Sequence, residues 1–113
     1  MQYLLLIYND ESRAHEPGLM KEYYDYTNSI RSSGHYIGGN ALQATATATS
    51  VRVRDGKTLL TDGPFAETAE QLGGYYLVEA ANLDDAVAVG ARIPGARTGT
   101  IEVRPLWVIP PPA

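Results

Sequence analysis

The sequence predicts a single α+β domain in which two helices cover one face of a β-sheet. Three observations favour this fold class. The expected elements follow in the order strand, helix, strand, hairpin, strand, helix, strand, and two of the strands are apolar at nearly every position. A chain of 113 residues also has room for only one substantial core. Because crossovers between parallel strands are right-handed, this order is most simply folded as a ferredoxin-like sandwich.

The first half begins with a strand over Gln2–Tyr8, which is continuously apolar rather than alternating. A polar loop follows at Asn9–Glu16. The next helix starts near Pro17, a residue favoured in a first turn, and ends at Gly34, which accepts left-handed geometry. The side chains expected to face the core recur at helical spacing: Leu19, Tyr23, Tyr26 and Ile30.

A hairpin is the clearest local feature of the middle of the chain. A short strand is expected over His35–Leu42, followed by a small alternating run at Ala44–Thr49. Val51–Arg54 and Lys57–Thr61 then flank Asp55-Gly56, a favoured pair for a two-residue hairpin turn. The alternation predicts that the valines face the core and the arginines face solvent.

The last third contains a strand over Tyr75–Ala80, a helix over Leu83–Ile93 with Asn82 as its N-cap, and a strand over Thr100–Val108. The helix is expected to bury a stripe of small and apolar residues: Leu83, Ala86, Val87, Gly90 and Ala91. We therefore expect one domain over residues 1–108 and a Pro-rich tail over residues 109–113.

Two strands of this sandwich have an apolar face that the helices of a single chain do not bury. The first and third core strands lie at the centre of a ferredoxin-like sheet, and here they are apolar on both faces. Helices cover only one face. The simplest cover for the other is a second copy, so we expect a homodimer whose two sheets pack face to face as a dimeric α/β barrel.

Composition excludes several classes of function. The chain has no cysteine, which removes disulfides, thiolate nucleophiles and Cys-based zinc sites. Its two histidines, twenty residues apart, predict no dedicated metal site, and we expect no organic cofactor. A net charge of −4 argues against nucleic-acid binding through bulk electrostatics. The apolar N-terminal run is too short for a signal peptide or a membrane span, so a cytoplasmic protein is expected.

The segment Asp62–Glu67 is the most informative loop and has two interpretations. As a turn, Asp62 bonds nearby backbone amides, the following Gly-Pro sets the backbone angles and Phe65 fills the core. As a site, Asp62 and Glu67 form a carboxylate pair at the mouth of a cleft. The two interpretations are compatible, because a rigid turn holds an acid in place.

Other candidates have structural as well as functional interpretations. His35 is a helix cap or surface group unless it meets Asp62 or Glu67, in which case the three form an acid/base site. Gly73-Gly74 precedes a strand and is expected to mark a bulge or close contact rather than a phosphate loop. Arg52 and Arg54 form a solvated face of an edge strand or, alternatively, bind an anion.

Several motifs together resemble one family. They are Tyr3–Tyr8, Thr49-x-Val51-Arg52, the long block Asp62–Leu77 and Glu102–Pro105. This pattern resembles the YCII-related (YciI-like) family, DGPF branch, over nearly the whole chain. The resemblance implies a ferredoxin-like dimeric α/β barrel in small cytoplasmic bacterial proteins, often encoded near extracytoplasmic-function sigma factors. It implies no established reaction.

The resemblance also brings a proposed catalytic His/Asp pair, which does not transfer to this chain. The histidine position corresponds to Tyr23, and the aspartate position corresponds to Ile93 before Pro94. Two functional hypotheses follow. One is a small-ligand pocket near Asp62–Glu67, with acid/base chemistry on a small polar molecule by Asp62, Glu67 and His35. The other is a non-catalytic interaction or regulatory module linked to a sigma factor.

Overall fold

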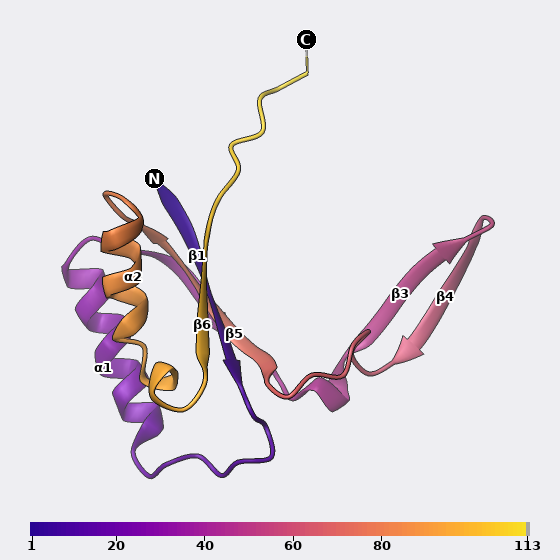
Figure 1. The fold of residues 1–113 in the computed structure, drawn as a ribbon, viewed down its shortest axis with the longest axis horizontal. Coiled ribbons are helices and arrows are strands. Elements are labelled where there is room, and N and C mark those ends of the chain that lie inside the picture. The colour runs from indigo at the N-terminus through magenta and orange to yellow at the C-terminus, as the bar shows by residue number, and fades with distance from the viewer. Residues whose placement is uncertain (113) are drawn as a thin grey trace.

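The structure of the protein is a computed structural model that describes residues 1–112. Two helices, α1 (Leu19–Ser32) and α2 (Leu83–Ala91), cover one face of a four-stranded antiparallel sheet (Figure 1). The sheet has the order β2-β5-β1-β6 and contains the following strands: β1 (Gln2–Asn9), β2 (Tyr36–Ala41), β5 (Gln71–Glu79) and β6 (Thr100–Pro105). The predicted ferredoxin-like α+β fold is confirmed, and β1 and β5 lie at the centre of the sheet as expected.

The two central strands present one face to the helices and the other away from them. Along β1, Tyr3, Leu5 and Ile7 are buried under the helices, whereas the residues between them are only half-buried. Along β5, Tyr76 and Val78 are buried on the same side. The alternation follows from the two-residue period of a strand, so the intervening apolar side chains point to the helix-free face.

Helix α1 contributes the side chains that the sequence predicts, but it starts later. Tyr26 and Ile30 are buried, and the Tyr26 hydroxyl donates to the carbonyl of Val89 at 2.8 Å. The helix begins at Leu19 because Gly18 adopts a left-handed φ of 81° immediately before it. Gly34 follows the helix with a φ of 82°, as expected for a glycine at this position.

Helix α2 differs from its prediction in which valine faces the core. Asn82 is the N-cap, and its side chain accepts a hydrogen bond from the Asp85 amide, which confirms the prediction. However, Val89 is 3% exposed, whereas Val87 is 49% exposed. The predicted stripe is therefore only partly right: Ala86 and Gly90 are buried as expected, whereas Leu83, Val87 and Ala91 are exposed and Val89, which the prediction omitted, is buried. The small residue Gly90 still permits close approach to the sheet, as expected.

Two glycines of β5 explain its contacts with the neighbouring strands. The register of β1 against β5 shifts between Ile7 and Tyr8, so that Gly73 is an extra residue between Leu72 and Gly74, as in a β-bulge. A Cβ on Gly74 would lie 2.9 Å from the carbonyl oxygen of Asn40. The structural interpretation of this glycine pair, a bulge with close backbone contact, is therefore confirmed.

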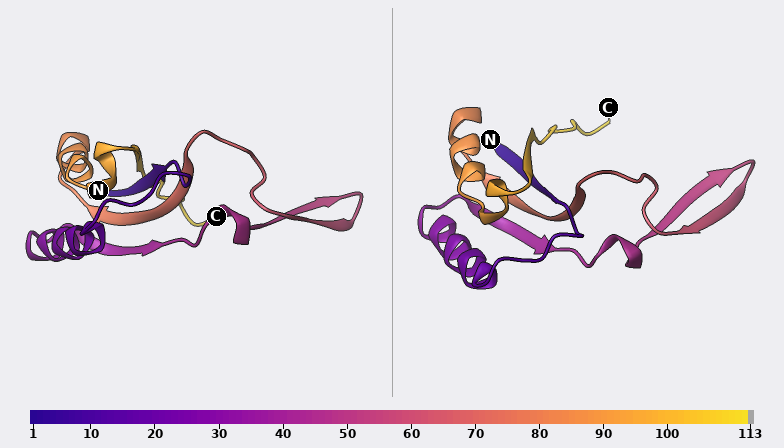
Figure 2. Two further views of the ribbon diagram at one scale, coloured as in Figure 1. Left: turned by 90° about the horizontal axis from the view of Figure 1, so that it is seen from below. Right: turned by 60° about the horizontal axis from the view of Figure 1, so that its bottom comes forward.

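The predicted hairpin forms, but it leaves the body of the protein. Strands β3 (Thr49–Arg54) and β4 (Lys57–Asp62) pair around Asp55 and Gly56, both with positive φ as a two-residue hairpin turn requires. The hairpin projects beyond the sheet on the side opposite the helices (Figures 1 and 2). Val51 is consequently 60% exposed, and the expectation that the valines face the core was wrong. We call residues 49–62 the arm.

The connections on either side of the arm and the C-terminal segment also depart from simple strands. The alternating run before the arm contains a 3-10 turn at Thr45–Thr47, and a second 3-10 turn at Pro94–Arg97 follows α2. Strand β6 ends at Pro105, although the Leu106 amide still donates to the Gln2 carbonyl at 3.0 Å. The expected Pro-rich tail ends on residue 113, which lies outside the described residues. Within residues 1–112, neither helix is long and apolar enough to cross a membrane.

The N-terminus of α2 is tied to the start of β2 by a carboxylate. The Asp85 side chain accepts a hydrogen bond from the Ala81 amide at 2.9 Å, and its Oδ1 lies 3.1 Å from Nε2 of His35. The Ala81 hydrogen bond is the main reason that the pKa of Asp85 is lowered, and His35 lowers it further. A folded-state pKa below the ordinary value means that the ionised carboxylate stabilises the fold.

A pair of valine substitutions tests the assigned core face of α2. Val89→Ala removes two methyl groups from the core and is expected to lower the free energy of unfolding by about 2 kcal/mol. Val87→Ala is the matched control on the exposed side, with an expected change below about 0.5 kcal/mol. Urea unfolding of both variants measures the difference. Equal losses, or a larger loss for Val87→Ala, would contradict the assigned orientation.

A second prediction concerns the pH dependence of stability. Because the pKa of Asp85 is lowered in the folded protein, its contribution is present above the ordinary pKa of 3.8 and is lost as the pH falls through the folded-state value. Asp85→Asn should therefore unfold at a lower temperature than the wild type at pH 7, and the difference should shrink near pH 3. Asp84→Asn, in the same helical turn, is the control. A pH-independent difference between wild type and Asp85→Asn would refute the ionic contribution.

Candidate functional site

The helix-free face of the sheet carries the candidate site. In its middle, Leu4 lies opposite Leu77 and Leu6 lies opposite Tyr75 in the pairing of β1 with β5. These four side chains are half-buried although no helix covers them. The face is therefore an apolar surface flanked by polar groups on the edge strands.

Polar side chains close the β2 edge of this face. Asn40 lies opposite Tyr75, and its side-chain amide donates to the Tyr75 hydroxyl at 2.9 Å. The tyrosine ring thus belongs to the apolar surface, while its hydroxyl is held at the edge of the sheet. This arrangement suits an amphipathic residue at a boundary between apolar and wet surroundings.

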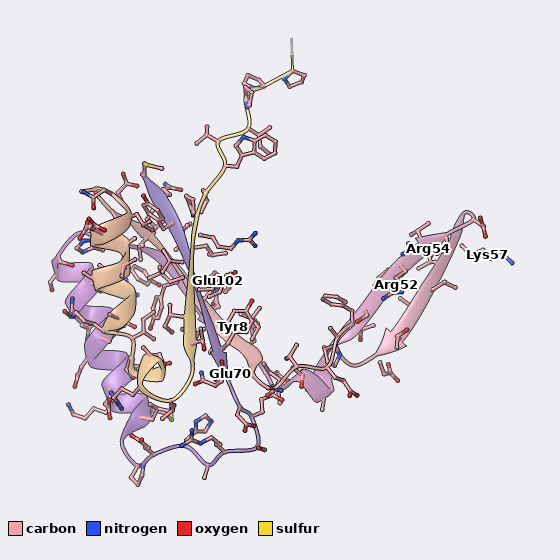
Figure 3. The ribbon with its side chains drawn as sticks, in the orientation of Figure 1. Tyr8, Arg52, Arg54, Lys57, Glu70 and Glu102 are labelled. Atoms are coloured by element: carbon pink, nitrogen blue, oxygen red, sulfur yellow. The ribbon has the colours of Figure 1, made fainter. Side chains whose placement is uncertain are left out.

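A phenol and two carboxylates, those of Tyr8, Glu70 and Glu102, lie at the other edge, beside β6 (Figure 3). The Tyr8 hydroxyl donates to Oε1 of Glu102 at 3.3 Å, and the Thr100 hydroxyl donates to Oε1 of Glu70 at 2.7 Å. Together with Thr68 and Ile101, these residues line a solvent-open depression of about 610 Å³. We call it the acidic depression.

The acidic depression combines a proton donor with hydrogen-bond acceptors. Partial burial and the charge of Glu102 raise the pKa of Tyr8 above its ordinary value of 10.0. The phenol is therefore protonated at neutral pH, and Glu102 accepts its hydrogen. The remaining carboxylate oxygens of Glu70 and Glu102 are available as acceptors for a ligand that brings N–H or O–H groups.

The two acids predicted from the loop do not lie in this depression. Asp62 ends β4 opposite Thr49, at the base of the arm, and Glu67 is an exposed residue of the following loop. Phe65 is 81% exposed, so the expectation that it fills the core was wrong. Gly63 does adopt the unusual positive φ, 95°, that the turn interpretation requires. The loop reaches the acidic depression through its last residues, Thr68 and Glu70.

His35 lies elsewhere, at the start of β2. Its Nδ1 is 2.7 Å from the Ser33 hydroxyl oxygen, and its Nε2 contacts the Asp85 carboxylate. Within residues 1–112, these are the side chains that hydrogen-bond to it, and Asp62 and Glu67 are not among them. The condition under which His35 would join an acid/base site, a contact with Asp62 or Glu67, is therefore not met within the single chain.

Ser33, His35 and Asp85 are hydrogen-bonded in the same order as the residues of a Ser-His-Asp catalytic triad. Their surroundings, however, favour a structural role. Ser33 is the C-cap of α1, and its hydroxyl also donates to the Ile30 carbonyl at 3.2 Å. Neither the acidic depression nor the second depression, near the N-terminus, is lined by these residues. The contacts join the end of α1, the start of β2 and the start of α2 into one corner.

None of the residues that line the acidic depression was predicted from the sequence as a site residue, and its ionisable members are Tyr8, Glu70 and Glu102. Tyr8 and Glu102 are ninety-four positions apart in the sequence, and they meet because β1 and β6 are neighbours in the sheet. Glu70 stands inside the long block that carries the family resemblance, three residues after Glu67. The available signal was the pairing of an N-terminal with a C-terminal strand, which places Thr100 opposite Tyr8 and Glu102 opposite Leu6. Among residues 1–112, no three His, Asp or Glu side chains gather so as to hold a metal ion.

Comparison with known proteins agrees with the resemblance noted in the sequence. The family model described as the YCII-related domain matches residues 1–110. An uncharacterized protein of Rhizobium meliloti (strain 1021) is 35% identical over 119 residues, which cover 98% of this chain and 96% of the relative. Both matches extend over nearly the whole chain, including every residue of the acidic depression. The chain therefore belongs to the YCII-related family.

Proposed function

We propose that this protein acts as a homodimer that binds a small polar molecule at the acidic depression. In this dimer the helix-free faces of two sheets pack against each other, as in a dimeric α/β barrel. The observation that carries the proposal is the apolar centre of that face, which both helices leave uncovered. A second sheet at the usual spacing of about 10 Å would bury it.

The surface area of the chain supports a large interface. The exposed area is 8143 Å², whereas a compact monomer of this mass exposes about 6,100 Å². The surplus of about 2,000 Å² exceeds the share that each copy contributes to many obligate dimers. The radius of gyration is 16.4 Å, against about 13 Å for a compact chain of this length. Both quantities fit a chain shaped to fold around another.

The ligand class follows from the charge of the depression. Glu70 and Glu102 supply negative charge and acceptors, and Tyr8 supplies a phenol. A small molecule with an amine or several hydroxyls would satisfy these groups, whereas an anion would be repelled. In the dimer the second copy would narrow the opening and exclude water, which strengthens each of these interactions.

The same groups support acid/base chemistry. A carboxylate can accept a proton from a bound polar molecule, and the phenol of Tyr8, whose raised pKa keeps it protonated, can donate a hydrogen bond to that molecule. Asp62 and Glu67, the acids first predicted for this role, remain candidates only if the second copy brings them to the depression. Glu70 is the better candidate for the base because it lines the depression in the single chain.

A second candidate function is a non-catalytic interaction module. It is favoured by exposed apolar side chains outside the sheet face, above all Trp107, which is 80% exposed in the C-terminal segment. The openness of the acidic depression also fits this candidate. A module of this kind would bind a protein partner through the C-terminal segment and would show no response to small molecules at Glu70.

The proposed dimer interface can be tested by placing a charge on it. The wild type should scatter light as a particle of twice the 12.2 kDa chain mass at micromolar concentration. Leu77→Glu puts a charge at the centre of the face and should weaken dimerisation at least about tenfold without loss of helix content. Val87→Glu, on the exposed side of α2, is the control and should stay dimeric. A monomeric wild type would overturn the proposal.

The proposed ligand site can be tested by removing one charge at a time. A thermal-shift screen of small amines and polyols should find compounds that stabilise the wild type. Glu70→Gln and Glu102→Gln should lose this stabilisation, because the isosteric amide removes the charge but retains the shape. Asp62→Asn and Glu67→Gln are the matched controls. If only the controls lose the response, the site lies in the loop instead, and if all four variants keep it, the assigned site is wrong.

A further inference from the structure

We infer that the arm clasps the second copy of the chain, with one face of its hairpin packed on that copy. This inference rests on the proposed homodimer and goes beyond it, because packing of the two sheet faces alone would leave the apolar face of the arm exposed to water. Its residues are 49–62, paired around the turn at Asp55-Gly56. The arm would then be a second interface, built from an element that the core fold does not need.

The first observation is that the arm is an isolated two-stranded ribbon. An unsupported hairpin is marginally stable in water, because two strands cannot bury a face between them. Here the paired strands project away from the sheet, and every residue of β4 is exposed. A sequence that specifies its turn this clearly therefore needs another surface to complete its packing.

The second observation is that the two faces of the arm differ in chemistry. Residues directly opposite in a hairpin share a face, and Val51 lies opposite Leu60 while Val53 lies opposite Thr58. This side is apolar, with Leu60 67% exposed. The other face carries the three basic residues of the arm, Arg52, Arg54 and Lys57, labelled in Figure 3, together with Ser50, Leu59 and Thr61. The apolar face is the one to be covered, and the basic face is suited to water.

The third observation is the direction of the arm. It projects on the side of the sheet away from the helices, which is the side on which the helix-free face is open (Figure 2). A second copy bound to that face would lie beside the arm. In a two-fold dimer each arm would contact the other copy in the same way, so both apolar faces would be covered by one symmetric exchange.

The root of the arm is built to hold this direction. The Gly63 amide donates to the Ala48 carbonyl at 2.7 Å, and the Ser50 hydroxyl donates to the Gly63 carbonyl at 2.9 Å. These bonds close the base of the ribbon where it leaves the body. Asp62 lies at this base, opposite Thr49, so its position is better explained by the arm than by the acidic depression.

The absence of cysteine makes the contact directly measurable. A single cysteine at Thr58→Cys, on the apolar face, carries a solvent-sensitive fluorophore, and Arg52→Cys carries the same label on the basic face as the control. At concentrations where light scattering shows the dimer, the label at residue 58 should emit at shorter wavelength. Its emission should shift to longer wavelength on dilution to the monomer, while the label at residue 52 should not change.

A set of unlabelled variants tests the energy of the contact. Val51→Thr/Val53→Thr/Leu60→Thr keeps residues that favour strands but makes the apolar face polar. It should raise the dimer dissociation constant at least about tenfold, which corresponds to about 1.4 kcal/mol. Arg52→Thr/Arg54→Thr is the control on the opposite face and should leave the dissociation constant within about threefold of the wild type.

The outcomes separate this inference from the dimer itself. A dimer in which the label at residue 58 stays solvent-exposed, with an unchanged dissociation constant for the triple variant, overturns the arm contact and leaves the sheet interface intact. Short-wavelength emission at residue 58 in the monomer shows that the arm packs on its own chain and also overturns the inference. A protein that is monomeric at every concentration overturns both proposals.

Discussion

The structure depends on one imbalance between the sheet and the helices. The sheet has two faces, and within residues 1–112 both helices cover the same face. Tyr3, Leu5 and Ile7 bury their side chains under the helices. Leu4 and Leu6, the residues between them, are equally apolar and lie on the other face. Burial of apolar area is the main favourable contribution to the free energy of folding and association. An apolar face left in water therefore forgoes a large stabilising contribution that a partner could provide. The proposed packing of two sheets and the proposed contact of the arm would each bury apolar surface that the single chain leaves exposed.

The sequence predicts those features whose cause is local. Asp55-Gly56 predicts a hairpin because few other pairs adopt two consecutive positive φ angles at low cost. Asn82 predicts the start of α2 because its short side chain bonds a backbone amide of the first turn. The order of elements then leaves few topologies, so the central position of β1 and β5 was also predictable.

Features that depend on distant partners were not predictable in this way. Alternation of valine and arginine correctly predicts an apolar and a basic face of the arm, but it does not say which surface covers the apolar one. The same limit explains α2, where Val87 and Val89 both fit a helical stripe and the packing of the helix on the rest of the core selects between them. An amphipathic pattern predicts that an element has an apolar face, but only the tertiary structure shows which surface packs against that face.

The candidate site shows the same division between local and distant causes. The acidic segment Asp62–Glu67, which begins at the last residue of the arm, predicts a site at Asp62 and Glu67, two residues that are close in sequence. The carboxylates that share a depression are Glu70, which directly precedes β5, and Glu102, which lies on β6, and they come together because both strands pair with β1. Finding Glu102 required the register of β6 on β1, and a shift of one residue would have moved its side chain to the helix-covered face.

The charges of the arm restrict the ways in which another chain can pair with it. An exposed hairpin has two free strand edges, and such edges invite pairing with any other strand. Arg52, Arg54 and Lys57 place positive charge on one face of the arm, and edge-to-edge pairing of two arms would bring these like charges together. Edge pairing is therefore disfavoured, while the valine face remains free to pack. The arm thus combines an apolar face that requires a partner with charges that disfavour pairing along its edges. This combination is expected for a closed dimer rather than an open-ended polymer.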